Sequence, residues 1–172
     1  MAPHPTQKIA DALESYSARA GEPVGAGAVS ATIELSPAGE ALRLDGIEQA
    51  NRLAVACRVV HHDAPSASVD LRAWAEGLAG RITYLFEPLC VQERDDEAGR
   101  ALLRSRDPDH RDGHRAYYQL ELACRPGEGR RGASLSRWAF DETTRARHPL
   151  PMQLTAETLA RLAEDLGMTA HA

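Results

Sequence analysis

Apolar and polar residues alternate with a period of two through most of this chain. The alternation is clear at Val29, Ala31, Ile33 and Leu35, and it returns beyond the turn at residues 36–39. Because the side chains of a β-strand point alternately to its two faces, this pattern predicts strands with one face in a core. The turns between the strands are short and rich in Gly, Asp and Pro, which favours an antiparallel sheet.

Three stretches have a helical period instead, at residues 6–20, 68–82 and 155–167, with caps expected at Thr6, Ser68 and Thr155. Strands are predicted at residues 29–35, 42–44, 53–60, 83–94, 100–106, 116–124 and 133–140. The order α-βββ-α-ββββ-α predicts an α+β fold, an antiparallel sheet of about seven strands with helices packed on one face. The length of 172 residues fits a single domain, 1–172.

The run at residues 53–60 is predicted to be a central strand, covered on both faces, and residues 61–67 are predicted to leave the sheet. The residues predicted to be buried in the core are Leu53, Val55, Cys57, Leu71, Trp74, Leu78, Leu120, Leu122, Leu159 and Leu162.

Composition limits the possible roles. The formal net charge of −5 argues against sequence-independent binding of nucleic acid. No apolar run approaches the length of a membrane span, and residues 1–8 contain no signal-peptide core, so a cytoplasmic location is expected. The three cysteines are far apart in the sequence, which is typical of reduced thiols. All basic residues except Lys8 are arginine, which indicates a GC-rich bacterial genome.

Two segments contain candidate metal ligands. Residues 107–114 combine carboxylates and imidazoles, and a second group follows the third predicted strand. If the two segments met, imidazole and carboxylate ligands could hold a transition metal. The alternative is an ordinary polar turn and an ordinary strand end. The candidates are His61, His62, Asp107, Asp109, His110 and His114.

A glycine-rich stretch at residues 127–132 matches the dinucleotide-binding spacing, but a strand is expected after it, where a phosphate site needs a helix. We expect a hairpin tip here, where Arg130 and Arg131 are exposed and could meet an acidic partner. Glu87 interrupts an apolar series. It either points inward as a carboxylate with a raised pKa, or is turned outward by a bulge at Pro88, which we expect.

The order of elements resembles that of the type III secretion chaperones, α-βββ-α-ββ-α, with two further strands here. The resemblance concerns topology and acidity only, and it carries over no functional residue. It implies a chaperone-like role.

No catalytic motif stands out, so the leading hypothesis is a non-catalytic, soluble bacterial protein-interaction or chaperone-like module. A homodimer is expected, because long strands need covered edges. No cofactor, nucleic acid or membrane partner is expected. One alternative is a metal-dependent enzyme that uses the six residues above. Another is a small-molecule-binding domain with a pocket between sheet and helices.

Overall fold

The computed structural model describes residues 3–19, 29–66 and 69–168. Its helices are α1 (Pro5–Arg19), α2 (Leu71–Arg81) and α3 (Ala156–Gly167), with a 3-10 turn η1 (Pro126–Glu128). Its strands are β1 (Ser30–Ser36), β2 (Glu40–Asp45), β3 (Gln49–Ala50), β4 (Ala54–Cys57), β5 (Val59–Pro65), β6 (Leu89–Asp95), β7 (Arg100–Ser105), β8 (Asp109–Arg111), β9 (His114–Arg125), β10 (Arg130–Asp141), β11 (Arg147–Leu150) and β12 (Met152–Thr155).

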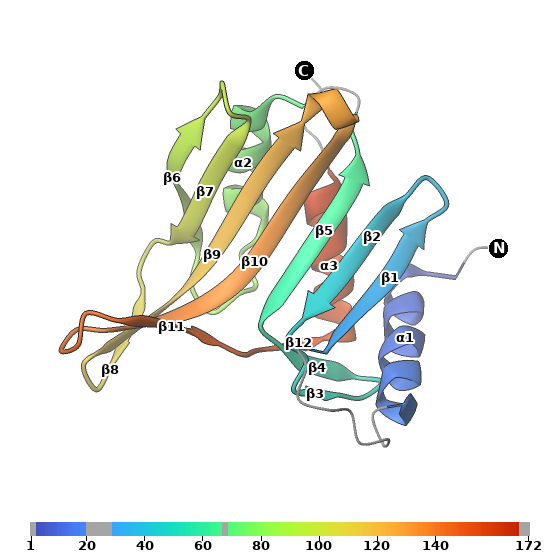
Figure 1. Cartoon of the computed structure of the whole chain (residues 1–172), viewed down its shortest axis with the longest axis horizontal. Coiled ribbons are helices and arrows are strands. Elements are labelled where there is room, and N and C mark those ends of the chain that lie inside the picture. Colours follow the sequence, from blue (N-terminus) through green and yellow to red (C-terminus); the bar gives the residue numbers. More distant parts are fainter. Residues whose placement is uncertain (1–2, 20–28, 67–68, 169–172) are drawn as a thin grey trace.

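The large sheet confirms the predicted α+β class. Its strands run in the order β1-β2-β5-β10-β9-β7-β6, and every pair is antiparallel. Two meanders, β1-β2-β5 and β6-β7-β9-β10, therefore meet where β5 pairs with β10. In Figure 1 α2 and α3 lie behind this sheet, and α1 lies beside β1. The face toward the viewer carries none of the three described helices.

The predicted third strand is wrong in its position, because the chain changes sheets at Arg58. β4 pairs with β12 and β3 in a small second sheet, and β5 then enters the large one. Leu53 precedes β4 in a turn, where the Asn51 side chain accepts hydrogen bonds from the N–H groups of Leu53 and Ala54. Leu53 is therefore 76% exposed, not buried as predicted. The sheet strand is β5, which includes the segment that was expected to leave the sheet.

The other nine predicted core residues are buried, in one cluster between the large sheet and the helices. Thr155 caps α3 as predicted, since its hydroxyl accepts a hydrogen bond from the N–H of Thr158. The cap of α2 is Asp70, whose carboxylate accepts from the N–H of Ala73, and the predicted cap Ser68 lies outside the described residues. The first helix begins at Pro5, one residue before the predicted cap.

Glu87 points inward, which corrects the outward orientation that we expected. Its carboxylate lies 2.8 Å from a terminal nitrogen of Arg137; Glu87 is buried, and the Arg137 side chain is 12% exposed. The Arg137 guanidinium also donates to the Tyr118 hydroxyl and lies over its ring. Burial raises the pKa of Glu87 above its usual range, although Arg137 opposes the change. This pair fastens the chain between α2 and β6 to the helix side of β10.

Candidate functional site

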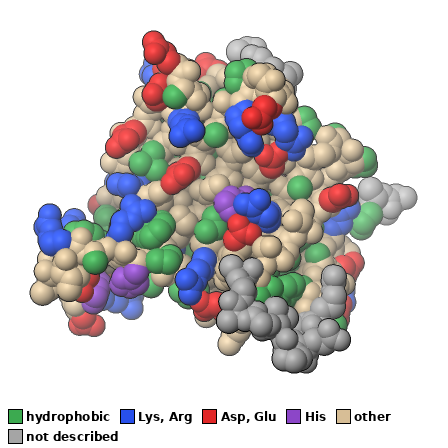
Figure 2. Space-filling view, in the orientation of Figure 1, with side chains coloured by type: hydrophobic (Ala, Val, Ile, Leu, Met, Phe, Trp, Pro, Cys, Tyr) green, Lys and Arg blue, Asp and Glu red, His purple; other side chains and the backbone are tan. Residues whose placement is uncertain are grey.

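The open face of the large sheet carries a broad groove of about 1070 Å³. It spans β1 to β6 and lies on the face opposite the helices, not between sheet and helices, where the small-molecule-binding alternative places a pocket. In Figure 2 this face presents cationic and anionic side chains side by side, with no large apolar patch at its centre. The site is therefore a polar trough open to solvent.

The ladder registers determine which side chains line the groove, because directly paired residues of antiparallel strands share a face. One row crosses the sheet through Ala41, Asp63, Gly132, Ala123, Arg100 and Asp95. The next row runs through Thr32, Arg43, His61, Ser134, Glu121, Leu102 and Glu93. A third row contains Asp45, Val59, Ser136, Gln119 and Arg104.

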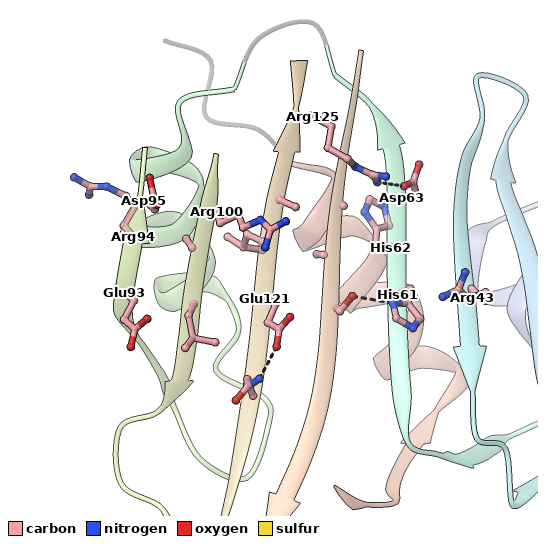
Figure 3. Close-up of a pocket in the computed structure, with 18 of the residues that line it drawn as sticks. Arg43, His61, His62, Asp63, Glu93, Arg94, Asp95, Arg100, Glu121 and Arg125 are labelled. Atoms are coloured by element: carbon pink, nitrogen blue, oxygen red, sulfur yellow. Dashed lines mark hydrogen bonds and ion pairs between the residues drawn. The ribbon is translucent and has the colours of Figure 1, made fainter. Parts of the chain in front are cut away.

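Small residues form the floor of the groove, and charged residues form its sides. Ala41, Gly132, Ser134 and Ala123 occupy the middle strands, where a long side chain would fill the trough. The sides carry both signs of charge, with Arg43 on β2 and Glu93 and Arg100 on β6 and β7 (Figure 3). The arrangement leaves a hollow with charged groups within reach of an occupant.

A hydrogen-bonded chain of three residues lies in the groove. His61 Nδ1 is 2.7 Å from the Ser134 hydroxyl, and His61 Nε2 is 2.9 Å from an oxygen of Asp45. Burial lowers the pKa of His61, and the nearby Arg43 lowers it further, although Asp45 opposes both effects. The imidazole is therefore neutral at neutral pH, with Ser134 on one nitrogen and Asp45 on the other.

The residue types are those of a serine hydrolase, but the surroundings of Ser134 differ. A hydrolase stabilises its oxyanion with free backbone N–H groups next to the nucleophile. Ser134 lies in the interior of the sheet, paired with His61 on one side and Glu121 on the other, and the ladder continues beyond it in both directions. The backbone N–H groups here are engaged in the sheet hydrogen bonds, so no backbone oxyanion hole lies next to Ser134. Asp45, His61 and Ser134 therefore order the groove surface without the donors that a hydrolase needs.

A second polar group lies across the floor from His61. Gln119 donates to Glu121 at 2.5 Å and accepts from Arg104 at 3.2 Å. At the upper end of the groove Asp63 forms ion pairs with Arg125 and Arg130. Side chains on neighbouring strands thus hold one another in place along the trough.

The structure does not bring the predicted metal ligands together. His61 faces the groove, whereas His62 points to the helix side, where its Nε2 lies 2.9 Å from Glu40. The 107–114 segment forms β8 and the start of β9. His61 pairs with Ser134 and His114 with Asp141, seven positions further along β10, which corresponds to about 23 Å of strand.

Within the 107–114 segment, Asp109 forms an ion pair with Arg111, and the ring of His114 stands edge-on to that of His148. His110 is exposed on β8, and Asp107 is exposed in the turn before it. Among the residues that the structure describes, no three His, Cys, Asp or Glu side chains gather in a way that could hold a metal ion.

The two arginines predicted at an exposed hairpin tip lie elsewhere. The tip is η1, and β10 begins at Arg130, whose guanidinium bonds Asp63 and the Gly39 carbonyl. Arg131 is buried on the helix side, where it donates to the carbonyl of Gly167 at the end of α3 and lies over the Trp74 ring. Burial lowers the pKa of Arg131.

Sequence reasoning missed the groove because most of its lining residues are ordinary strand residues. The alternation of apolar residues along β10 does predict which arginines lie on the buried side. Arg131 and Arg137 lie in phase with Ala133, Leu135 and Ala139, the apolar positions of that strand, so alternation alone places both on the buried side.

No family model, curated protein or solved structure matches this chain. The resemblance to secretion chaperones therefore depends on the order of elements alone. No helix in the described part of the chain is long and apolar enough to cross a membrane.

Proposed function

We propose that this chain is a non-catalytic binding protein that holds a polypeptide segment in the open-face groove. The observation that carries the proposal is a floor of small residues, Ala41, Gly132, Ser134 and Ala123, at the centre of a sheet face that no described helix covers. Sheets with one open face usually present a solvated polar surface. A trough of this volume within that surface can receive an extended segment of several residues.

The charges of the groove support a polypeptide over a ligand of one sign. Arg100 and Arg104 form no ion pair with a carboxylate in the described part of the chain, and Glu93 and Glu121 form none with a cation. Both signs are thus available to an occupant. A segment with mixed charges would satisfy both sets, and charge complementarity would fix its direction in the groove.

The edge strands of the sheet favour binding on its open face over the addition of another strand at its edges. β6 has a bulge between Val91 and Glu93 and ends in charged residues, and β1 has a bulge between Glu34 and Ser36. Bulges and charges on edge strands hinder the addition of another strand. The proposal therefore needs neither strand addition nor the homodimer that covered edges would require.

A peptide selection tests this proposal. A random peptide library displayed on phage is selected on the protein, and the enriched peptides are synthesised and titrated by calorimetry. Ala123→Trp fills the floor, and Gln7→Trp places the same bulk on the exposed surface of α1. We expect Ala123→Trp to weaken binding about tenfold or more, roughly 1.4 kcal/mol, and Gln7→Trp to leave it unchanged. Equal affinity for both variants, or a failure to enrich any peptide, contradicts the proposal.

A second candidate function is an ester hydrolase, favoured by the hydrogen bond between Ser134 and the neutral imidazole of His61. The binding proposal expects wild type and Ser134→Ala to hydrolyse p-nitrophenyl acetate at the same slow rate, because the sheet leaves no backbone donor for an oxyanion. A loss of most of the activity in Ser134→Ala would favour the hydrolase.

A further inference from the structure

A small projecting arm extends the open face beyond the groove. It consists of β8, β11 and the ends of β9 and β10 that pair with them, and it projects at the lower left of Figure 1. Tyr117 pairs with Trp138, and Phe140 pairs with both Arg115 and Arg147. Their positions along β9 and β10 place these residues on the same side as Ser134 and Glu121. We call this side of the arm the arm face.

Arginine side chains cover the aromatic rings of the arm face. The guanidinium of Arg147 lies 4.0 Å from the centre of the Trp138 ring. Those of Arg115 and Arg145 lie 5.2 Å and 5.6 Å from the centre of the Phe140 ring. A guanidinium over an aromatic ring is attracted by the negative face of the ring, and because Arg145 and Arg147 are exposed, their N–H groups remain accessible to solvent.

The arm face also carries more positive charge than its neighbours balance. Arg115 forms an ion pair with Glu142 at 3.1 Å. Arg145 and Arg147 are exposed and form no ion pair with a carboxylate of the described residues. The whole chain has a formal net charge of −5, so the sign is reversed on the arm face, whereas the opposite side of the arm carries Asp109 and Asp141. In Figure 2 basic, His and acidic side chains all lie over the arm.

We infer that the arm face binds an acidic polypeptide segment, through carboxylates that meet the stacked guanidinium groups of Arg145 and Arg147. A guanidinium held on a ring presents paired N–H donors that match the two oxygens of a carboxylate. The ring faces are occupied by arginine, so a nucleobase would have to displace a guanidinium before it could stack. The geometry therefore favours carboxylates over nucleic acid. This surface adjoins the groove at Arg104, which lines the groove and lies 5.7 Å from the centre of the Tyr117 ring. Arg145 and Arg147 do not line the groove, so the inference does not require the groove to bind anything.

Fluorescence anisotropy with defined probes tests this inference. The probes are a labelled peptide of alternating glutamate and serine, the same peptide with glutamine for glutamate, and a single-stranded thymidine oligonucleotide of equal charge. The test variant is Arg145→Gln/Arg147→Gln. The matched control is Arg161→Gln on α3, because Arg161 is also an exposed arginine stacked on an aromatic ring, Tyr84, at 4.4 Å, but on the helix side of the sheet.

We expect the glutamate peptide to bind wild type and Arg161→Gln alike, with an affinity that falls as salt rises. The double variant should bind it about tenfold more weakly, as expected for two partly exposed ion pairs. The glutamine peptide should not bind. Equal binding to the double variant overturns the inference, and so does tighter binding of the oligonucleotide than of the peptide. Ala123→Trp, which fills the groove, should leave this binding intact, so that failure of the groove proposal and failure of this inference are distinguished.

Discussion

The buried pair of Glu87 and Arg137 makes a sharp prediction about stability. Their charged atoms lie 2.8 Å apart, and the exposed fractions of the side chains are 7% and 12%. Removing one partner leaves the other charged and out of water, which typically costs about 3–5 kcal/mol of the free energy of unfolding. We expect Glu87→Met to lower the free energy of unfolding by about 3 kcal/mol, at the low end of this range, because Arg137 keeps its hydrogen bond to the Tyr118 hydroxyl and its contact with the Tyr118 ring.

The double variant Glu87→Met/Arg137→Met should cost less than either single change, because it leaves no charge unpaired. Its main remaining loss is the hydrogen bond from Arg137 to the Tyr118 hydroxyl, worth about 1 kcal/mol. The costs of the two single changes should therefore not add. Their sum should exceed the cost of the double variant by more than about 2 kcal/mol.

Urea unfolding followed by circular dichroism measures this cycle. The control is Arg52→Met, which removes an exposed pair with Glu14, 2.9 Å apart, and should change stability by less than about 1 kcal/mol. Single changes whose costs simply add, or a Glu87→Met cost as small as that of the control, would refute the reasoning.

The dependence of this cycle on pH has a definite sign. Burial raises the pKa of Glu87, so the native state takes up this proton at a higher pH than the unfolded chain does. As pH falls through the native pKa towards the ordinary value of 4.5, wild type should gain stability relative to Glu87→Met.

Three further predictions concern single positions. Leu78→Ala should cost about 2–5 kcal/mol in urea unfolding because Leu78 is fully buried, whereas Leu53→Ala should stay within about 0.5 kcal/mol; equal costs would contradict the packing. Because the pKa of His61 is lowered, the unfolded chain protonates this imidazole before the native protein does as pH falls below the ordinary value of 6.5, and the wild type should therefore lose stability. In parallel urea unfolding, His61→Gln should lose less stability over the same pH range. Identical profiles of stability against pH would count against the burial of the imidazole. Gly99 and Gly129 both have positive φ, but a Cβ on Gly99 would lie 2.7 Å from the Cys124 carbonyl oxygen, whereas a Cβ on Gly129 would meet nothing within 4 Å. Gly99→Ala should therefore lower the melting temperature by more than Gly129→Ala does.

The order of elements could be predicted because each element leaves a local mark in the sequence. The period of two marks β1, β2 and the strands after α2, and the helical stripe of α3 follows a capping threonine. The prediction failed at residues 53–65, where polar side chains hide a strand. In β5 the residues Val60, His62 and Ala64 are buried, and a histidine in the buried series obscures the alternation.

The groove could not be predicted in the same way, because it depends on pairing between distant strands. Whether Ser134 lies beside His61 is decided by the register of β10 on β5, and no local pattern encodes that register. Each small residue of the floor is unremarkable in its own strand. Only the pairing of four strands, β2, β5, β10 and β9, places Ala41, Gly132 and Ala123 in one row.

The pairing of β5 with β10 also determines when the large sheet can be completed during synthesis, because the first meander is made long before its partner strand. The first meander is synthesised and can close on itself before β10 exists, which leaves the N–H and C=O groups along one side of β5 without a partner. α3, which contacts both β5 and α1, is the last described element to be made. We expect nascent chains that end before residue 130 to be held by chaperones or to aggregate through β5, and to lose that tendency once β10 has emerged.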